Sequence, residues 1–268
     1  MLKKAEEKWA VITGASSGIG LEFVRQLYEK GYSLLLVARR KHRLLTIRWK
    51  LQKRPKGTYE VLEADLSTEE GRDKLKKWMD VHKVDLFINN AGFGLAGDFL
   101  ETDPETEEDM IKVNVLAMHI LMKYAVRKMQ EQGEGAVLNV ASSAGLFPGG
   151  PYMATYYATK AYVTSLTQAV AQELKEKESR VYVGCLCPGP VDTEFNKVAD
   201  VQFALKGITP KKCVRSALRG IRSRKVVIVP TLTMKAATMG GRLLPRSIAV
   251  KLTGRQQKQK LAGDSPEE

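Results

Sequence analysis

A glycine-rich turn near the start of the chain sets the strongest limit on how this sequence can fold. The apolar run 10–13 predicts a strand, and Thr13-Gly-Ala-Ser-Ser-Gly-Ile-Gly20 follows it directly. A helix is expected over 21–30, ended by Gly31. Glycines in such a turn let the backbone approach a phosphate closely, and the helix N-terminus presents free N–H groups to it. This strand–turn–helix unit therefore predicts a nucleotide-binding site.

Short apolar runs alternate with amphipathic helical stretches along the rest of the chain. Further strands are expected at 34–38, 59–63, 86–89, 136–140, 181–186 and 226–229. Further helices are expected at 43–53, 104–129, 156–177 and 210–222. This alternation is typical of an α/β fold in which helices cover both faces of a parallel sheet, the doubly wound Rossmann type. The 268 residues can form one domain, and no linker divides them.

Composition excludes several other classes of protein. An apolar fraction of 44% and a charged fraction of 27% are those of a soluble globular protein. No apolar run reaches the roughly 18 residues that a membrane helix needs. The charged segment 1–8 is unlike a secretory signal. Cys185, Cys187 and Cys213 form no even framework and no Cys-x-x-Cys motif, so we expect a reducing, cytoplasmic compartment and no metal site.

The net charge of +13 is concentrated near the C-terminal end. Residues 201–268 hold 15 Lys and Arg against three acidic residues. Basic and apolar residues interleave in the tail: Arg242, Leu243, Leu244, Arg246, Ile248, Lys251, Leu252 and Arg255. A basic amphipathic helix of this kind can lie on an anionic membrane surface. The alternatives are a solvated helix that covers a pocket, or disorder. The tail has no stacking aromatic residues, so no nucleic-acid partner is expected.

Tyr156 and Lys160 stand four residues apart in the expected helix 156–177. At i and i+4 a phenol and an ammonium share one face of a helix and can reach one ligand. A positive charge beside a tyrosine favours the phenolate and lowers a pKa that is normally about 10. The pair predicts an acid–base site, although chance also places Tyr-x-x-x-Lys in helices. Tyr157 points about 100° away and is expected to be a packing or interface residue.

Two arginines after the second strand bear on the choice of cofactor. An acidic residue there would bind the ribose hydroxyls of NAD, but the chain has Arg39 and Arg40. A guanidinium suits the 2′-phosphate of NADP. Charge-assisted hydrogen bonds of about 1.5–3 kcal/mol would give roughly a 10–150-fold preference for NADP. The alternative is a solvated basic loop, because Lys41 and Arg43 continue the run.

Several motifs, in the right order, resemble those of the short-chain dehydrogenase/reductase family over residues from about 8 to 230. They are the turn 13–20, Asp65, Asn89-Asn-Ala-Gly92, Asn114, the segment 139–145, Tyr156 with Lys160, and Pro188-Gly-Pro-Val-Asp-Thr193. The resemblance implies a catalytic domain over 1–240, with a substrate loop at about 190–209, and a basic tail over 241–268. It also implies hydride transfer between NADP(H) and a carbonyl or secondary alcohol.

The resemblance implies a set of cofactor-binding residues, carried over motif by motif. They are Gly14, Ser16, Ser17, Gly18, Ile19, Gly20, Arg39, Arg40, Asp65, Leu66, Asn89, Ala91, Gly92, Tyr156, Lys160, Pro188, Gly189, Val191 and Thr193. Lys160 would bind the nicotinamide ribose and lower the pKa of Tyr156. Tyr156 would donate a proton during reduction, and Asn114 would position a water that links Lys160 to solvent.

The catalytic serine can be assigned in two ways. Alignment on Ala144-Gly145 selects Ser142, which would hydrogen-bond the reacting oxygen. The usual family separation from the tyrosine selects Ser143 instead. We prefer Ser142, because the end of the strand fixes its place and the following loop can absorb one extra residue.

The expected substrate pocket is mostly apolar. In the family its walls come from three loops, which here supply Phe93, Leu95, Leu146, Phe147, Tyr152, Met153, Phe195, Val198 and Phe203. The residues expected to contact substrate are Ser142, Phe93, Phe147, Tyr152 and Phe195. No clamp for a carboxylate or phosphate is evident, so a lipophilic ketone, aldehyde or acyl carbonyl is expected. The alternative is that half of these residues are ordinary core.

Assembly and activity each leave alternatives open. Relatives commonly form homodimers or homotetramers through the helices that here cover 115–129 and 156–177. A different class of function is an NADPH-binding regulatory or scaffold protein without turnover. The presence of Ser142, Tyr156 and Lys160 favours an enzyme over that alternative. Within enzymes, an epimerase or a dehydratase is also possible.

Overall fold

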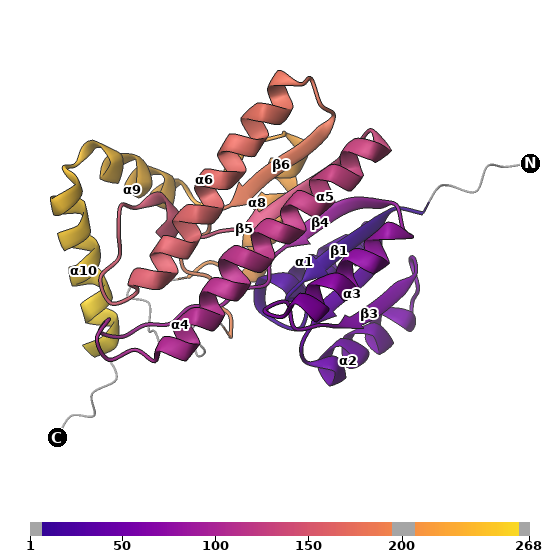
Figure 1. The fold of residues 1–268 in the computed structure, drawn as a ribbon, viewed down its shortest axis with the longest axis horizontal. Coiled ribbons are helices and arrows are strands. Elements are labelled where there is room, and N and C mark those ends of the chain that lie inside the picture. The colour runs from indigo at the N-terminus through magenta and orange to yellow at the C-terminus, as the bar shows by residue number, and fades with distance from the viewer. Residues whose placement is uncertain (1–6, 195–206, 263–268) are drawn as a thin grey trace, which may run out of the picture.

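The computed structural model describes residues 7–194 and 207–262. Its centre is a parallel sheet of seven strands in the order β3-β2-β1-β4-β5-β6-β7, with helices on both faces (Figure 1). The strands are β1 Trp9–Thr13, β2 Ser33–Ala38, β3 Tyr59–Glu63, β4 Val84–Asn89, β5 Gly135–Val140, β6 Val181–Leu186 and β7 Val227–Ile228. The predicted doubly wound α/β fold is therefore confirmed.

The helices follow the expected alternation with three differences. They are α1 Gly18–Glu29, α2 Lys41–Gln52, α3 Glu69–Asp80, α4 Pro104–Ile111, the π-helix η1 Lys112–Ala117, α5 Met118–Gln132, the 3-10 helix η2 Ser143–Leu146, α6 Ala154–Glu176, α8 Pro210–Arg222, α9 Leu232–Leu243 and α10 Arg246–Ala262. Helix α3 was not predicted. The helix expected over 104–129 is interrupted by η1. The described part of the predicted tail, 241–262, contains the end of α9 and all of α10.

Local sequence signals explain where several helices begin. Thr68, Asp103 and Thr209 each accept a hydrogen bond from the backbone N–H three residues later, which satisfies one free donor of the first turn. Pro104 and Pro210 then occupy the first helical position, where the missing N–H costs nothing. The predicted start of α8 at Pro210 is confirmed.

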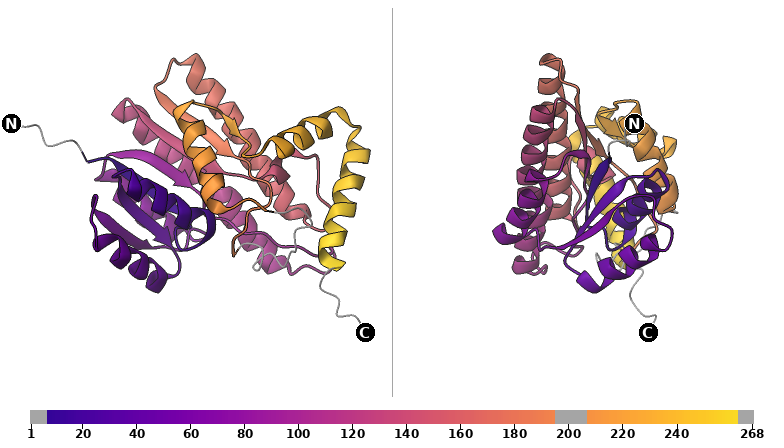
Figure 2. Two further views of the ribbon diagram at one scale, coloured as in Figure 1. Left: turned by 180° about the vertical axis from the view of Figure 1, so that it is seen from behind. Right: turned by 90° about the vertical axis from the view of Figure 1, so that its right-hand side faces the viewer.

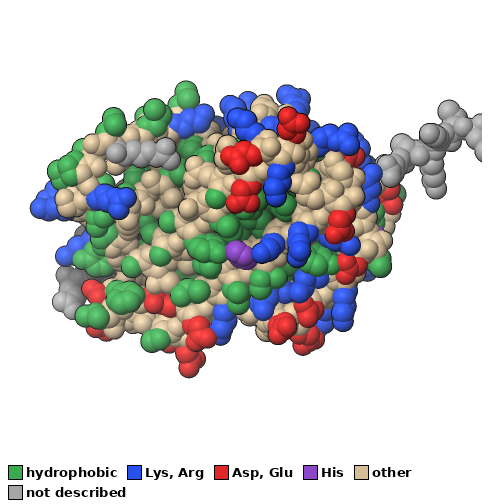
Figure 3. Space-filling model, turned by 45° about the horizontal axis from the view of Figure 1, so that its top comes forward, with side chains coloured by type: hydrophobic (Ala, Val, Ile, Leu, Met, Phe, Trp, Pro, Cys, Tyr) green, Lys and Arg blue, Asp and Glu red, His purple; other side chains and the backbone are tan. Residues whose placement is uncertain are grey.

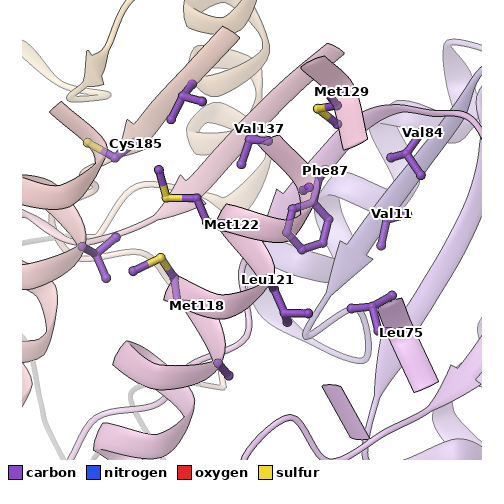
Figure 4. Close-up of a cluster of buried hydrophobic side chains, with 14 of the residues drawn as sticks. Val11, Leu75, Val84, Phe87, Met118, Leu121, Met122, Met129, Val137 and Cys185 are labelled. Atoms are coloured by element: carbon purple, nitrogen blue, oxygen red, sulfur yellow. The ribbon is translucent and has the colours of Figure 1, made fainter. Parts of the chain in front are cut away.

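The core lies on both faces of the sheet, because alternate residues of each strand point to opposite sides. On one face, Val11, Phe87 and Val137 pack against α3 and α5 (Figure 4). On the other face, Ile12 and Leu34 pack against α1, α2 and α8. The resulting three layers are seen edge-on in the right-hand view of Figure 2. Helices cover both faces of the sheet, so functional groups are expected where the strands end.

The order of the strands reverses between β1 and β4. β1 pairs with β2 on one side and with β4 on the other, and the chain leaves β1 toward β2 and returns to β4. In open parallel sheets, ligands bind beyond the carboxyl ends of the strands at such a switch point. The predicted turn at 13–20 and the segment 89–92 lie at these two strand ends. The topology therefore brings the predicted cofactor motifs to one place.

Helices α9 and α10 stand at the opposite end of the molecule from β3 (Figures 1 and 2). Ala249, Thr253 and Gln257 of α10 are buried, and Thr253 Oγ1 donates a hydrogen bond of 2.8 Å to the carbonyl of Gly149. The tail is thus packed on the domain as far as Gln257. Among the helices of residues 7–194 and 207–262, none combines the length and apolar character needed to cross a membrane.

Candidate active site

A cavity of about 560 Å³ lies at the carboxyl edge of the sheet. Its walls come from the turn after β1, the segments that follow β2 to β6, and the start of α6. Helices α9 and α10 close one end through Met234, Ala237, Gln256 and Gln257. The cavity is long, with a glycine-rich end and an apolar end, and the two ends are described in turn.

The turn between β1 and α1 has a backbone that only glycine accommodates well. Gly14 and Gly18 have φ of +65° and +55°, in the left-handed region. A Cβ at Gly20 would lie 2.2 Å from the carbonyl oxygen of Gly14. Ser17, the N-cap of α1, makes no side-chain capping bond, and Gly18 and Ile19 line the cavity. The N-terminus of α1 therefore faces a space suited to a pyrophosphate.

A set of short hydrogen bonds joins the end of β1 to the end of β4. The Thr13 hydroxyl accepts from the backbone N–H of Asn90 at 2.8 Å and of Ala91 at 2.9 Å. The Asn90 amide donates back to the Thr13 carbonyl at 2.8 Å. Asn89, predicted to bind cofactor, instead donates to Met118 O and Asn139 Oδ1 inside the core and lies outside the cavity lining. Asn90 lines the cavity in its place.

Arg40 covers the part of the cavity next to the glycine turn. Its Nη2 donates to Ser16 Oγ at 3.2 Å and to Ser17 Oγ at 3.1 Å. Arg39 also lines this end. Glu194 lies within 3.6 Å of Arg40 and 2.8 Å of Arg43, and the Arg43 guanidinium holds the pKa of Glu194 below its usual value. The sequence had given no sign of this carboxylate beside the two arginines.

The first end of the cavity fits a dinucleotide cofactor. Two glycines in the left-handed region, a helix N-terminus and a pair of arginines are placed for a pyrophosphate and its sugars. Asp65 keeps its carboxylate at this end by accepting from the backbone and hydroxyl of Ser67, at 3.0 and 2.7 Å. The predicted cofactor residues that line the cavity are Gly14, Ser16, Ser17, Gly18, Ile19, Arg39, Arg40, Asp65, Leu66, Ala91, Gly92, Tyr156, Lys160, Pro188, Gly189, Val191 and Thr193.

Ser142, Tyr156 and Lys160 meet in the middle of the cavity. Tyr156 is buried and hydrogen-bonded to the side chain of Ser142. Burial raises the pKa of Tyr156 to about 12, and the bond to Ser142 offsets only part of that rise. We expected Lys160 to lower the pKa of Tyr156, but burial, which raises it, has the larger effect. The phenol is therefore neutral at physiological pH and can act as a proton donor.

Lys160 is buried beside Tyr156. Its Nζ donates to the Val140 carbonyl at 3.1 Å and lies 5.8 Å from the centre of the Tyr156 ring. Burial lowers the pKa of Lys160 to about 8. The helix α6 can approach η2 this closely because position 145 is glycine: a Cβ there would lie 2.2 Å from the Lys160 carbonyl. The i, i+4 spacing correctly places both groups on one wall.

Asn114 is held just behind this wall by η1. Its Nδ2 donates to Phe93 O at 2.8 Å and to Thr159 Oγ1 at 3.2 Å, and its Oδ1 accepts from the Phe93 N–H at 3.1 Å. The side chain is buried and does not line the cavity. A π-turn inserts one residue into a helix and re-aims the side chains around it. Here it points an amide toward the loop that follows β4.

The geometry distinguishes the two candidate serines. Ser142 Oγ accepts from the N–H of Ala144 at 3.1 Å, which caps η2 and fixes the hydroxyl in place. The same side chain bonds Tyr156. Ser143 also lines the cavity, but its backbone N–H is bound to the Pro188 carbonyl at 2.7 Å. The arrangement favours Ser142 as the partner of the tyrosine.

The second end of the cavity is apolar. A cluster of Met110, Ala144, Met153, Tyr156 and Tyr157 is joined by Phe93, Leu95, Ala96 and Phe147. Of the residues predicted to contact substrate, Ser142, Phe93 and Phe147 line the cavity. Tyr152 does not; it lies in a separate groove against α10. Phe195, with Val198 and Phe203, falls outside the described residues.

Tyr157 is a buried packing residue, as expected, and it also lines the cavity. It is buried, and its hydroxyl accepts a hydrogen bond of 2.6 Å from Gln257 Nε2 of α10. Its ring meets that of Tyr156 edge to face, with centroids 6.5 Å apart. The cavity is wide enough for both tyrosines to reach it. The bond joins two residues a hundred positions apart, so no local pattern could have predicted it.

Comparison with known proteins agrees with this geometry. A family model described as short chain dehydrogenase matches residues 8–202. The very-long-chain 3-oxoacyl-CoA reductase of Scheffersomyces stipitis is 33% identical over 229 residues, which are 81% of this chain. The matched part is 64% of that reductase, so this chain spans less than two thirds of its relative's length.

Solved structures with the same architecture include a short-chain dehydrogenase from Sphingobium yanoikuyae in complex with NADPH. It has a TM-score of 0.80 and 30% identity, and the match covers 88% of this chain and 94% of that one. The bulky-bulky ketone specific alcohol dehydrogenase from Comamonas testosteroni has a TM-score of 0.75 and 27% identity, with coverage of 89% and 95%. The chain therefore belongs to the short-chain dehydrogenase/reductase family of nicotinamide-dependent oxidoreductases.

Proposed function

We propose that this protein is an NADP(H)-dependent carbonyl reductase that acts on lipophilic ketones, aldehydes or acyl carbonyls. The observation that supports this most directly is the position of the Tyr156 hydroxyl. It is bonded to Ser142 and stands where the glycine-rich end of the cavity meets the apolar end. A reducing cofactor on one side and an apolar carbonyl compound on the other would meet at this hydroxyl.

The chemistry would divide between the cofactor and the protein. The bound nicotinamide would supply the hydride. As the carbonyl oxygen gains negative charge, the neutral Tyr156 phenol donates its proton to it, and the Ser142 hydroxyl donates a hydrogen bond to the same oxygen. A pKa near 12 suits Tyr156 to be the acid in the reductive direction. Positioned acid catalysis of this kind contributes about 10²–10⁴-fold.

Lys160 would hold the nicotinamide ribose and return a proton to Tyr156. Its pKa of about 8 leaves it mostly protonated at neutral pH, so it can give up a proton at little cost. Asn114 holds the loop after β4 through Phe93. We propose that a water next to Asn114 completes the path from Lys160 to solvent.

The preference for NADP rests on Arg40. Its guanidinium lies across Ser16 and Ser17, where the 2′-phosphate of the adenosine ribose would lie next to the turn. Arg39 adds a second positive charge at the same end. The Glu194 carboxylate, 3.6 Å from Arg40, opposes this assignment, and we propose that it turns away from Arg40 when the phosphate binds.

The apolar end of the cavity supports a lipophilic substrate. Phe93, Phe147, Met153 and Met234 supply its surface, and the polar groups that the described residues add there are hydroxyls and the amides of Gln256 and Gln257. Two of the three similar proteins named above are described as a very-long-chain 3-oxoacyl-CoA reductase and a bulky-bulky ketone specific alcohol dehydrogenase. Both descriptions are compatible with an extended apolar substrate for this chain.

We also propose a homodimer or homotetramer in the cytoplasm. Leu116 and Tyr162, on η1 and α6, are apolar or aromatic and 45% and 39% exposed, and they lie in the segments through which relatives commonly assemble. Cys185, Cys187 and Cys213 are free and buried, as is usual in a reducing compartment. Sedimentation velocity would test the assembly directly.

The test is NADPH oxidation against ketones and aldehydes of increasing chain length, with NADH in parallel. Rates should grow with chain length and require NADPH. Tyr156→Phe should lose turnover by at least about 10²-fold, with little change in NADPH affinity. Tyr157→Phe is the matched control, because it removes a neighbouring hydroxyl and should keep turnover within about tenfold. Retention of more than about a tenth of the activity in Tyr156→Phe would contradict the mechanism.

The regulatory alternative predicts a different result. Tight NADPH binding without turnover of any carbonyl compound would favour a cofactor-binding regulatory protein. An epimerase or dehydratase would convert substrate without net NADPH oxidation, so product analysis accompanies the absorbance assay.

A further inference from the structure

Helix α9 has two faces of opposite character. Met234 and Ala237 face the cavity, and Thr238 is buried. The other face carries Leu232, Ala236, Met239 and Leu243, spaced as one stripe of an α-helix. The three large residues of this stripe are 81%, 67% and 88% exposed. In the described structure, the stripe is apolar surface on the outer side of the helix that closes the active site.

The apolar surface continues past α9 onto α10. Leu244 connects the two helices, and Ile248 and Leu252 follow at a spacing of four residues, each roughly half exposed. The inner face of α10 is buried, through Ala249 and Gln257 among others. Hydrophobic side chains are seen along the upper left edge in Figure 3, the side where Figure 1 places these helices. We call Leu232, Met239, Leu243, Leu244, Ile248 and Leu252 the outer apolar surface.

Every charged side chain on the segment that carries the outer apolar surface is basic. The sequence has no Asp or Glu between Asp200 and Asp264. Lys235, Arg246, Lys251 and Arg255 are exposed on α9 and α10, and none forms an ion pair with another described residue. Elsewhere on the surface, basic side chains are commonly paired with carboxylates, as Lys112 is with Glu108. This end of the molecule therefore combines exposed apolar side chains with uncompensated positive charge.

We propose that α9 and α10 dock on an anionic lipid bilayer. The outer apolar surface would enter the boundary between headgroups and acyl chains, and the basic side chains would contact lipid phosphates. A second copy of this chain fits less well, because two such surfaces would bring like charges together. A bilayer supplies both an apolar interior and a negative surface, which are the two properties that this surface complements.

The position of the docking surface bears on the reaction, a point that rests on the proposed function. The helices that would touch the bilayer also line the substrate end of the cavity, through Met234, Ala237 and Gln257. A lipophilic carbonyl compound dissolved in the bilayer would then have a short path to Tyr156. Activity toward such substrates should depend on the membrane, whereas activity toward a small water-soluble ketone should not.

The experiment is cosedimentation of the full-length protein with vesicles of phosphatidylcholine alone or mixed with phosphatidylglycerol. The protein should sediment with the mixed vesicles, and added salt should weaken binding. The double variant Met239→Glu/Leu243→Glu should reduce binding by about tenfold or more. Lys251→Gln and Arg255→Gln should each reduce it about fivefold. Val81→Glu is the matched control: Val81 is 78% exposed on the C-terminal side of α3 and should leave binding unchanged.

Three further measurements separate the possible outcomes. Unfolding midpoints confirm that each variant folds. NADPH oxidation with a small water-soluble ketone should be the same in wild type and the surface variants, so a failure of the proposed reaction would show there and leave the vesicle result intact. The proposal is overturned if mixed vesicles do not bind the protein, or if Val81→Glu weakens binding as much as the double variant. A double variant that instead lowers the oligomeric state, without vesicle binding in wild type, would identify the surface as a contact between copies.

Discussion

The two ends of the cavity are built in different ways. The cofactor end consists mainly of backbone and short side chains at the ends of strands, such as Gly14, Ser16 and Gly92. The substrate end consists of long side chains on helices and loops, such as Phe147, Met234 and Gln257. A cavity wall made of backbone atoms has a shape that is determined by the fold itself. A wall of side chains can change shape while the fold stays the same.

The difference implies that the two ends respond differently to substitution. At the cofactor end an added methyl group meets backbone that cannot move. At the substrate end a changed side chain alters the shape of the cavity and the choice of substrate. Four experiments with substituted proteins test this contrast, and they are ordered by the size of the effect expected.

The largest effect is expected at Gly20. A Cβ there would lie 2.2 Å from Gly14 O, so Gly20→Ala should lower the free energy of unfolding by ~3 kcal/mol and prevent NADPH binding. Gly240→Ala in α9 is the matched control. A Cβ at Gly240 meets no atom within 4 Å, and alanine should stabilise the helix by ~0.5–1 kcal/mol. Urea unfolding measures the stability of both variants, and NADPH fluorescence measures their cofactor binding. An equal loss of stability in the two variants would contradict the proposed difference between the two ends.

Lys160, where the two ends meet, should give a distinctive dependence of stability on pH. Burial lowers its pKa from 10.5 to about 8. Between these values the unfolded chain binds more protons than the folded one, so the Lys160 contribution to the free energy of unfolding rises with pH. The size is about 1.4 kcal/mol per pKa unit. Burial of Tyr156 acts in the opposite direction above pH 10, as its pKa is raised to about 12.

The measurement compares wild type with Lys160→Met at pH 8 and at pH 10. The variant lacks the Lys160 contribution. The free energy of unfolding of wild type, relative to that of the variant, should therefore be higher at pH 10 than at pH 8. Urea unfolding at each pH provides the free energies. If the free energy of unfolding changed equally with pH in the two proteins, burial would not lower the pKa of Lys160 in solution.

A smaller effect is expected at the adenosine side of the cofactor end. Arg40→Ala removes the guanidinium that bonds Ser16 and Ser17, and should reduce the preference for NADPH over NADH by about 10–150-fold. Glu194→Gln should strengthen NADPH binding, because a negative charge 3.6 Å from Arg40 is removed. Titration with both cofactors measures each change. A variant Arg40→Ala that loses both cofactors equally would assign the arginine to structure and not to phosphate recognition.

The smallest effect is expected at Gln257, at the substrate end. Gln257→Leu removes the hydrogen bond to Tyr157 and should change KM for carbonyl substrates by up to about tenfold, or ~1 kcal/mol. NADPH affinity should not change. Tyr157→Phe should have a similar effect, and the double variant should add little to either one. Additive effects would show that the two side chains act separately.

The cofactor end could be predicted from sequence because its signals are local. The turn 13–20 requires glycines within eight residues, and Tyr156 and Lys160 are neighbours on one helix face. Strand ends in a parallel sheet then bring these motifs together. Gly20 and Asn89 are exceptions, because neither lines the cavity; the Asn89 side chain turns into the core while Asn90 takes the position next to the cavity. Two adjacent asparagines give no indication of which one faces the ligand.

The substrate end could be predicted only in part. Phe93 and Phe147 line it as expected, but the contacts that α10 makes there join distant parts of the chain. Gln257 reaches Tyr157 across a hundred residues, and Thr253 reaches Gly149 across a similar separation. The helical spacing correctly predicted that Tyr157 points away from Tyr156. It could not predict that the cavity is wide enough for both side chains to line it. The interruption of the helix at η1 was also missed, because an inserted residue leaves the apolar pattern on either side intact.

The hydrogen bonds of α10 also determine when the active site is completed during synthesis. Every element of the cofactor end lies before residue 195, and α10 is made after all the other described elements. Domains begin to fold while the chain is still being made. A nascent chain that has emerged only as far as residue 194 therefore carries the residues of the cofactor end but lacks the α9–α10 wall of the substrate end. The cavity closes only when Thr253 and Gln257 leave the ribosome and bind Gly149 and Tyr157.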